Sequence, residues 1–599
     1  MIFGRHINRY YLKYAPMLLL GLLALTVVDY MQLVIPELYR MVINGVKDGF
    51  VLTDAGSVPF DIEFVLDEIC RPMLYIIVAM VIGRFLWRVC FFGAGIRVET
   101  SLRGKMFDRC KNLSQEYYQV NKVGNLMSFF TNDLDTVQEC FSWGVLMLFD
   151  ALMLGVLAVL KMAKMNPYLT LLCLIPMSLL LASSLIVGKY LTAKWDKRQA
   201  AFSDLSDFSQ ETFAGIAVVK AFVKETHELL QFRKLSRKNE DTNVDYTRLS
   251  VLLNVCLTLF IESVVCVIIG YGGYLVYTNV FDAGQLVEFI GYFNTIIWPV
   301  MAISELIGMH AQGKASLNRI SELLDAQPAV VDRTDVQAPG EIRGDIDFKN
   351  LTFTYPDGEM PVLTDVSFSI KAGENVGIIG RTGSGKTTVV DLILRTYNVP
   401  DGTLFIDGHD VNTIPIKAVR DAAAYVPQDN FLFSDTIENN ISFATDNGTP
   451  EDVISAAKMA DVHDNIDEFP EKYESVLGER GVTVSGGQKQ RISIARALMK
   501  NAAILILDDS VSAVDVKTEK AILENLRTLR KGKTTILIAH RISTIEQMDK
   551  IIFIDDGKIA AVGTHAELYA ANSDYRNMVD LQKLDDAEEA PAGEVIAHA

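Results

Sequence analysis

The sequence predicts a protein of two parts, an α-helical domain with six membrane spans followed by a soluble α/β domain. Three observations lead to this fold class. Six apolar runs in the first half are long enough to cross a bilayer. The composition changes near residue 326. Beyond that point, short apolar runs alternate with helical patterns, which is typical of α/β folds.

The six apolar runs each hold about the 20 residues that an α-helix needs to cross the hydrocarbon core. They occupy roughly residues 15–43, 72–93, 139–163, 167–189, 250–278 and 285–310. The alternative is a set of buried helices in a large soluble protein, but soluble helices of this length normally keep a polar face. We therefore expect residues 1–325 to form a transmembrane domain with long cytoplasmic loops.

Basic residues predict which side of the membrane each loop faces. The polar stretches near 94–138 and 190–249 are rich in Lys and Arg, whereas the loop near 46–71 is acidic. The positive-inside rule then places the N-terminus and both long basic stretches in the cytoplasm. Lys161 and Lys164 oppose this orientation, but the other basic residues outnumber them.

The overall charge and the cysteines exclude some classes of partner. Residues 1–345 carry a net charge of −3 and the remainder carries −15, which together make the total of −18. So acidic a second half argues against nucleic acid, because phosphate backbones require basic patches. All seven cysteines lie in the first half and none forms a CxxC pair, which argues against a zinc site.

The second half divides into three segments. Residues 326–345 contain Pro, Gly and charge, which predicts a linker. Residues 346–583 show the α/β pattern of a nucleotide-binding domain. Residues 584–599, LDDAEEAPAGEVIAHA, are acidic and poor in apolar side chains, so we expect a disordered tail.

The motif GRTGSGKTT follows the apolar run Asn375–Ile379 and opens a helical pattern. A strand, a glycine-rich loop and a helix in this order are the context of a phosphate-binding loop (P-loop). Glycines let backbone N–H groups turn toward phosphate oxygens, the lysine reaches the β- and γ-phosphates, and Thr387 can offer its hydroxyl to Mg²⁺. The expected nucleotide-binding residues here are Gly380, Gly383, Ser384, Gly385, Lys386, Thr387 and Thr388.

The stretch ILILDDSVSAVD, Ile504–Asp515, begins as an apolar run of strand length and stops on two aspartates. Asp508 is expected to end the strand and to bind Mg²⁺, directly or through water. A solvated strand-end acid is the alternative, and the P-loop upstream argues against it. Between these motifs, VSGGQKQR stands at the start of a helical pattern, where exposed N–H groups can bind an anion. By itself this third motif is equally typical of an ordinary loop.

Together the motifs resemble an ATP-binding cassette (ABC) domain, in which SGGQ stands between a P-loop and an Asp-ended strand. The resemblance implies that Tyr355, in FTYPDG, stacks on adenine and that Gln428, in YVPQDN, links the Mg²⁺ and γ-phosphate region to the membrane domain. It also implies that His540, in IAHRIST, is the switch histidine at the γ-phosphate. A lone His or Gln is more often structural, but the complete set in the family's order is specific.

The same resemblance implies further contacts. Ser485, Gly486, Gly487 and Gln488 form the SGGQ signature, Asp515 is similar to the D-loop aspartate, and Glu479, in GERG, is similar to a loop that touches the transmembrane helices. Residues 125–139 and 210–225 resemble intracellular loops of ABC exporters. Six spans ahead of one cassette make a half-transporter, so two chains would dimerise and hold two ATP and Mg²⁺. Each site would join one chain's P-loop to the other chain's SGGQ, with coupling helices near Glu116–Val120 and Thr212–Ala217.

Asp509 departs from the family, which usually has glutamate at this position to polarise the attacking water. A general base must come within about 2.6–3.2 Å of its target, or act through one water. Aspartate is shorter by one C–C bond of about 1.5 Å, and a misplacement near 1 Å can cost on the order of 10²-fold in rate. The sequence therefore predicts a site that binds ATP but hydrolyses it slowly. DDSVSAVD resembles the degenerate half of bacterial heterodimeric multidrug exporters, and the alternative is a homodimer in which Asp509 serves adequately.

The membrane-depth residues bear on the cargo. Ionisable residues are costly there and are candidates for function; they are Asp29, Arg84, Arg88, Asp150, Glu262 and Glu305. Pairing with neighbouring helices and recognition of cationic amphiphiles are both compatible with them. Trp87, Tyr292, Phe293 and Trp298 are aromatic candidates for lining a cavity or for packing. Pro36 and Pro299 are candidates for loosening their helices.

The function expected from the sequence is one half of an ATP-driven exporter of amphiphilic or drug-like cargo in a bacterial cytoplasmic membrane. Its partners would be a second half-transporter, membrane lipid and small amphiphilic cargo. Two further alternatives stay open at this point. One is a subunit whose ATP site is mainly a regulatory clamp, and the other is an importer on the same fold.

Overall fold

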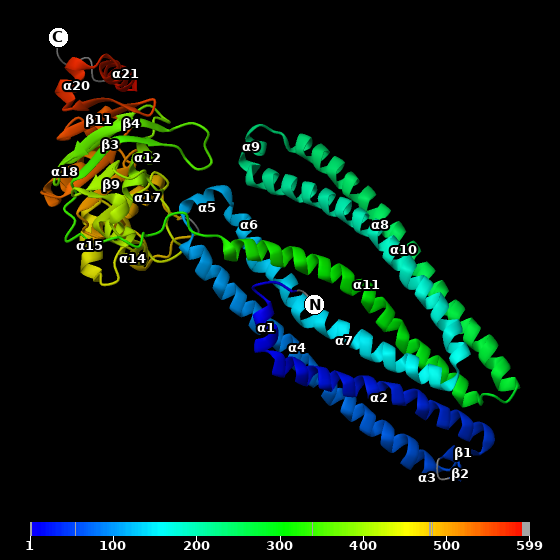
Figure 1. Ribbon diagram of the computed structural model, residues 1–599. Helices are drawn as coiled ribbons and strands as arrows, with labels where there is room; N and C mark the ends of the chain where they lie inside the picture. Colours follow the sequence, from blue (N-terminus) through cyan, green and yellow to red (C-terminus); the bar gives the residue numbers. More distant parts are fainter. Residues whose placement is uncertain (1–2, 54–55, 338, 479–480, 482, 590–599) are drawn as a thin grey trace. The chain divides into compact units, whose positions relative to one another are not determined.

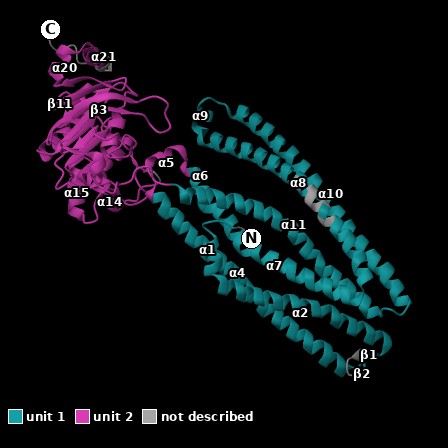
Figure 2. Ribbon diagram, viewed as in Figure 1, with its two compact units in different colours: residues 1–111, 124–326 teal, residues 112–123, 327–599 magenta. Residues whose placement is uncertain are grey.

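A computed structural model describes residues 3–53, 56–337, 339–478, 481 and 483–589. The chain forms two compact units, shown in teal and magenta in Figure 2. The first comprises residues 1–111 and 124–326, and the second comprises residues 112–123 and 327–599. The expected membrane domain ended at residue 325, so one short segment of it, 112–123, groups instead with the second unit.

In the described residues of the first unit there are six long helices, and each coincides with one of the six predicted apolar segments, the fifth of which extends one residue past α10 (Figure 1). They are α2 (Ala15–Asp48), α4 (Arg71–Asn112), α7 (Leu134–Met165), α8 (Pro167–Ala214), α10 (Glu225–Tyr277) and α11 (Ala283–Asp325). By length and apolarity five of them can cross a membrane, and in α8 the apolar stretch found among the described residues is Pro167–Leu179. This confirms the predicted helical membrane domain. At the start of α11 the Asp282–Gln285 capping box sets the first helical residue two positions before the predicted apolar segment.

Short elements connect these helices. They are α1 (Asn8–Lys13), β1 (Phe50–Thr53), β2 (Gly56–Pro59), α3 (Ile62–Phe64), η1 (Val65–Cys70), α6 (Val123–Ser128), η2 (Phe129–Asp133) and α9 (Ile216–Ala221). The helix α9 lies where the second coupling helix was expected, but it begins four residues later than Thr212 because α8 continues to Ala214.

Prolines inside two of the long helices pack against glycines of neighbouring helices. A Cβ added to Gly291 of α11 would lie 2.9 Å from the ring of Pro36 in α2, and one added to Gly155 of α7 would lie 3.4 Å from Pro299 in α11. The missing side chains let α2, α7 and α11 approach closely, as small residues do in membrane helix packing. Both prolines lie within continuous helices.

A polar network also joins these three helices. Arg40 Nη1 of α2 donates to Glu288 Oε2 of α11 at 3.1 Å, and the Tyr292 hydroxyl donates to Glu288 Oε1 at 2.9 Å and to Glu37 Oε1 at 3.1 Å. Lys161 of α7 forms an ion pair with Glu37. Two acids and two bases therefore neutralise one another, and the buried Tyr292 is a packing residue of this cluster.

Two sheets form the core of the second unit. The first is antiparallel, in the order β4 (Leu363–Ile370), β3 (Ile346–Phe353), β6 (Leu404–Ile406) and β7 (His409–Asp410). The second has the order β12 (Lys558–Gly563), β11 (Lys550–Asp555), β5 (Asn375–Gly380), β10 (Thr534–Ile538), β9 (Ile504–Asp508) and β8 (Ala423–Val426). All pairs of the second sheet are parallel except β11 with β12. This confirms the predicted α/β domain.

The second unit also contains helices and short turns. They are α5 (Gln115–Val120), α12 (Lys386–Ile393), η3 (Val411–Thr413), α13 (Ile416–Ala422), α14 (Ile437–Ser442), α15 (Pro450–Met459), α16 (His463–Asp467), η4 (Lys472–Glu474), α17 (Gly486–Met499), α18 (Val516–Leu529), α19 (Ile542–Ile545), α20 (His565–Ala571) and α21 (Ser573–Glu589). The last helix continues six residues into the segment 584–599 that we expected to be disordered. Leu, Ala and Glu in that stretch favour helix, and residues 590–599 lie outside the described part.

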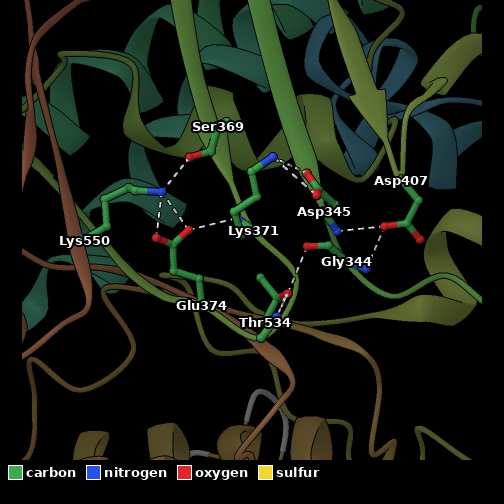
Figure 3. A network of polar contacts seen from close by, with 9 residues as sticks. Gly344, Asp345, Ser369, Lys371, Glu374, Asp407, Thr534 and Lys550 are labelled. Atoms are coloured by element: carbon green, nitrogen blue, oxygen red, sulfur yellow. Dashed lines mark hydrogen bonds and ion pairs between the residues drawn. The ribbon is translucent and has the colours of Figure 1, made fainter.

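A network of polar contacts fastens the two sheets together (Figure 3). Lys550 at the start of β11 donates to Ser369 O of β4 at 3.0 Å and to Glu374 at 2.7 Å. Thr534 at the start of β10 donates to Gly344 O, just before β3, at 2.9 Å. Burying these groups is tolerated because each finds a partner.

The position of the central strands decides where chemistry can occur. Every residue of β9 and of β10 is buried, and both strands pair in parallel with neighbours in the same sheet. The carboxyl ends of β5, β9 and β10 therefore meet at one edge, which is where open α/β sheets bind ligands.

Candidate nucleotide-binding site

The P-loop connects the end of β5 to α12. Gly383 and Gly385 have φ angles of +81° and +95°, which only glycine adopts easily. A Cβ at Gly380 would lie 2.1 Å from the carbonyl oxygen of Ile554 in β11, so close strand packing requires glycine there. The buried hydroxyl of Ser384 has no hydrogen-bond partner among the described residues. A phosphate oxygen at this loop would supply one, so these residues fit a nucleotide phosphate.

Lys386 and Asp508 form the charged centre of the site. Lys386 Nζ donates to the carbonyl oxygens of Gly380 and Arg381, both at 2.9 Å, and burial lowers the pKa of its ammonium. Asp508 ends β9 and is 1% exposed. Burial raises the pKa of its carboxyl, against a hydrogen bond from the Thr387 hydroxyl that lowers it. A buried carboxylate beside a hydroxyl supplies the oxygen ligands that Mg²⁺ prefers, so Thr387 and Asp508 fit a Mg²⁺ site.

A pocket of about 240 Å³ brings the predicted residues together. Its lining includes five of the predicted P-loop residues and three residues from the neighbouring strand ends and loops: Gly383, Gly385, Lys386, Thr387, Thr388, Gln428, Asp508 and His540. Gln428 is exposed just after β8, and His540 lies two residues beyond β10. Residues far apart in the chain thus converge on one phosphate-sized space.

Asp509 occupies an unusual backbone conformation. Its φ is +45°, in the left-handed region that aspartate tolerates better than most residues. Its N–H donates to Ile538 O at 3.0 Å, and its carbonyl accepts from Ser512 Oγ at 2.9 Å. Although half-buried and beside Asp508, Asp509 is not among the described residues that line the pocket.

Tyr355, expected to stack on adenine, lies beside the P-loop helix. Its hydroxyl shares a hydrogen bond of 2.9 Å with Thr388 Oγ1, and its ring packs edge-on against Phe353 and Tyr397. The half-buried ring leaves part of its surface accessible. Thr388, also predicted to contact nucleotide, therefore holds the tyrosine in this structure.

The signature residues begin helix α17. Ser485 caps it, accepting from Gln488 N at 3.3 Å, while Gln488 Oε1 accepts from Ser485 N at 2.9 Å. Gly486 is exposed, and a Cβ there would meet open space, whereas one at Gly487 would lie 2.9 Å from Ala513 O. The exposed start of a 14-residue helix is an anion-binding feature facing out of this chain.

Asp515 caps helix α18, because its carboxylate accepts from Lys517 N at 3.1 Å and Thr518 N at 3.0 Å. These backbone contacts hold the pKa of Asp515 below its usual range. The predicted D-loop aspartate therefore has a local structural role in the single chain. Glu479, the residue expected to touch the transmembrane helices, lies outside the described residues.

Three residues near the site escaped the sequence analysis. Gln490, buried in α17, donates to Asp509 O at 3.4 Å and accepts from Ala513 N at 2.9 Å. The Tyr425 hydroxyl donates to Asp508 Oδ2 at 3.5 Å. Gln582 of α21 contacts the backbone on both sides of Arg541. No local motif marks these residues; Gln490, two residues after the signature glutamine, offered the nearest signal.

Comparisons with known proteins agree with this geometry. Residues 18–300 match the family described as ABC transporter transmembrane region, and residues 363–512 match the family described as ABC transporter. The chain is 36% identical over 593 residues to YheI of Bacillus subtilis, a probable multidrug resistance ABC transporter ATP-binding/permease protein, with 98% of each chain covered. It is also 36% identical over 575 residues to the multidrug resistance-like ATP-binding protein MdlA of Escherichia coli, covering 96% of this chain and 95% of MdlA.

The fold has a solved counterpart. A bacterial Atm1-family ABC exporter with ATP bound superposes with a TM-score of 0.77 at 25% identity, covering 98% of this chain and 99% of that one. The chain therefore belongs to the ABC transporter family. It is an ABC exporter with one transmembrane region followed by one ATP-binding cassette, and the cassette is an ATPase coupled to transport.

Proposed function

We propose that this chain is one half of a heterodimeric exporter, and that the ATP site on its own P-loop is degenerate. The observation that carries the proposal is Asp509, in the place of the glutamate usual in the family. Its backbone N–H donates to Ile538 O and its carbonyl accepts from Ser512 Oγ, so a forward shift of the chain to compensate for a short side chain would break these hydrogen bonds. The reach of the carboxyl then depends on side-chain length alone, and one methylene is missing.

Nucleotide binding does not depend on Asp509. The P-loop backbone and Lys386 would hold the phosphates, while Thr387, Asp508 and Gln428 would hold Mg²⁺, which neutralises phosphate charge when bound. All of these residues line the pocket. Tyr355 would support the base, and His540 would contact the terminal phosphate. This chain thus supplies its own groups for nucleotide binding, but the Asp509 carboxyl that would activate water for hydrolysis is one methylene too short.

The signature of this chain would complete the partner's site. Ser485 and Gly486 are exposed at the start of α17, where helix N–H groups can meet the phosphates of an ATP held by a facing cassette. The four residues SGGQ are intact, as this role requires. Most turnover would then occur at the partner's P-loop, with ATP at this chain's P-loop serving to hold the cassettes together.

Amphiphilic, drug-like cargo is the second part of the proposal. YheI and MdlA are named for multidrug resistance. In α7, Asp150 Oδ2 accepts from Trp298 Nε1 of α11 at 2.6 Å, and Trp298 is 39% exposed. In the described chain no basic side chain forms an ion pair with Asp150 or with the buried Asp29 that contacts it. An acid and an aromatic ring without a basic partner suit an organic cation.

We place the protein in a bacterial cytoplasmic membrane, with the N-terminus and the cassette in the cytoplasm. The apolar helices require a membrane, and the relatives named above are bacterial. The basic stretch before the third span and the basic stretch after the fourth span support this orientation.

Two substitutions at one position test the proposal in the purified assembly. Asp509→Glu should raise ATP hydrolysis at this chain's site by on the order of 10–100-fold, because it restores the reach of the base. Asp509→Asn should change total ATPase little, because this site contributes little. A homodimer with an adequate Asp509 gives the opposite pattern, with no gain from Glu and a large loss from Asn. Thermal unfolding of each variant checks that Glu tolerates the positive φ.

A further inference from the structure

The switch histidine stands on a short segment whose backbone is held by a distant helix. His540 lies between β10 and α19, and the segment connecting them is only Ala539–Arg541. Ala539 N donates to Ile378 O of β5 at 3.2 Å. Beyond that point the contacts come from Gln582, whose Nε2 donates to His540 O at 2.7 Å and whose Oε1 accepts from Ile542 N at 2.8 Å.

Helix α21 delivers Gln582 with the same face that anchors it to the core. Tyr575, Val579 and Gln582 stand at i, i+4 and i+7, one stripe of an α-helix. Tyr575 and Val579 are fully buried, and the Tyr575 hydroxyl shares a hydrogen bond of 2.9 Å with His565 Nδ1. The side chain of Gln582 thus projects from a helix that Tyr575 and Val579 anchor to the core.

The chemistry of the contact requires an amide. His540 offers a carbonyl and Ile542 offers an N–H, so the bridging side chain must donate and accept at once. Glutamine does both. A glutamate at this position would accept from Ile542 but would set a carboxylate against the His540 carbonyl oxygen, and a leucine would leave both backbone groups without this partner.

We propose that Gln582 is a positioning residue that holds His540 at the mouth of the nucleotide pocket, so that recognition of the terminal phosphate depends on the C-terminal helix. His540 lines the pocket together with Lys386 and Gln428, so a shift of its backbone would change the position of its ring relative to these residues. The inference rests on the proposed role of His540 at the terminal phosphate. The inference adds that α21, a helix outside the nucleotide motifs, controls how His540 contacts the terminal phosphate.

A second contact ties helix α19, which directly follows this segment, to α18. The hydroxyl of Thr544 in α19 donates to Glu519 of α18, and Glu519 is 5% exposed. The segment carrying His540 is thus held between α18, which follows Asp515, and α21. Loosening Gln582 should leave the α18 contact in place, so the fold of the segment survives while its position relaxes.

The test is the discrimination between ATP and ADP at this chain's own site. The full-length transporter is photolabelled with 8-azido-ATP on ice, this chain is resolved from any partner by electrophoresis, and unlabelled ATP or ADP competes. Gln582→Leu should reduce the preference for ATP over ADP by about 3- to 10-fold, because one or two hydrogen bonds that position His540 are lost. Competition by ADP should stay unchanged. Asn577→Leu, an exposed amide on the same helix, is the matched control and should change neither.

A second variant separates positioning from general damage. His540→Ala should lower the ATP preference, and adding Gln582→Leu to it should lower it no further, because both changes act through one contact. If Gln582→Leu leaves the preference intact while His540→Ala lowers it, the positioning role is wrong. An equal loss of ATP and ADP binding in Gln582→Leu would also overturn it, since that indicates a merely structural role. If His540→Ala itself has no effect, the proposed role of His540 fails instead.

Discussion

At the scale of the residue, neighbouring acids differ because their surroundings differ. Asp508 is buried at the end of β9, whereas Asp509 has a positive φ and is half-buried. Adjacent positions on a strand point to opposite sides, and the turn after β9 adds a further change of direction. Asp508 therefore faces the P-loop with Thr387, and the role of Asp509 depends on how far its side chain reaches.

Asp391 of α12 is a third acid close to this centre, and it makes a prediction about pH. Burial, followed by the charge of Asp508, raises the pKa of Asp391 from 3.8 to about 6. The folded state thus holds its proton at a higher pH than the unfolded state does. The contribution of Asp391 to the stability of the nucleotide-free protein should therefore fall as pH rises from about 4 to about 6 and then level off.

Asp391→Asn should remove that dependence. At pH 7 the substitution should stabilise the nucleotide-free protein by on the order of 1–3 kcal/mol, since each pKa unit corresponds to about 1.4 kcal/mol. Thermal unfolding of both proteins between pH 4.5 and 8 measures this. Asp446→Asn, at an exposed acid, is the control and should give parallel curves. A constant difference between Asp391→Asn and the parent across that range would contradict the prediction.

At the scale of the element, long-range ion pairs set how the membrane helices pack. Arg40 and Glu288 lie 248 residues apart, and Glu288 is 4% exposed. A buried charge is costly unless it is paired, so each residue depends on the other. The Pro36–Gly291 contact joins the same two helices, α2 and α11, and brings their backbones close.

Replacing one member of the Arg40–Glu288 pair should lower the stability of the protein more than replacing both members. Glu288→Leu leaves the Arg40 guanidinium without its acidic partner, while the Tyr292 hydroxyl keeps Glu37 as an acceptor. The substitution should destabilise the protein by roughly 3–5 kcal/mol, because it leaves an unpaired charge. The double variant Arg40→Met/Glu288→Leu should recover most of that loss. Thermal unfolding in detergent measures both, with Glu262→Leu at an exposed acid of α10 as the control. Equal destabilisation by the single and double variants would show that the pair does not act as a unit.

At the scale of the whole molecule, the exposed signature has its proposed ligand outside this chain. The start of α17 is exposed, and Gly486 has open space where a side chain would stand. Gly487, in contrast, packs against the carbonyl of Ala513. A substitution at Gly486 can therefore block a facing site without disturbing this chain's own packing.

The difference between Gly486 and Gly487 gives a test of whether most ATP hydrolysis occurs at the partner's P-loop or at this chain's own P-loop. Gly486→Glu should reduce the ATPase of the assembly by on the order of 10²-fold, because a carboxylate would stand where the partner's phosphates bind. Lys386→Ala, which disables this chain's own P-loop, should leave a large part of the activity. Steady-state hydrolysis of Mg-ATP by the two purified variants makes the comparison. A homodimer would lose its activity in both.

The sequence by itself determined the two-part fold, the six apolar segments and the order of the nucleotide motifs. These follow from features of short range, namely the length of apolar runs and the spacing of glycines, a lysine and acids. The shortened side chain at Asp509 is also a fact of composition. The fold and the coupled ATPase are confirmed, while the heterodimer, the cargo and the individual roles of the site residues stay predictions.

Only the tertiary structure decided how distant residues meet. The positive φ of Asp509, the hold of Gln582 on the His540 segment, the Arg40–Glu288 pair and the grouping of residues 112–123 with the cassette have no local signal. Each depends on which faces of separate elements pack together, and no periodicity within one element encodes that choice. The sequence therefore predicts the site's chemistry, and the packing of α21, β10 and α17 decides how that chemistry is positioned.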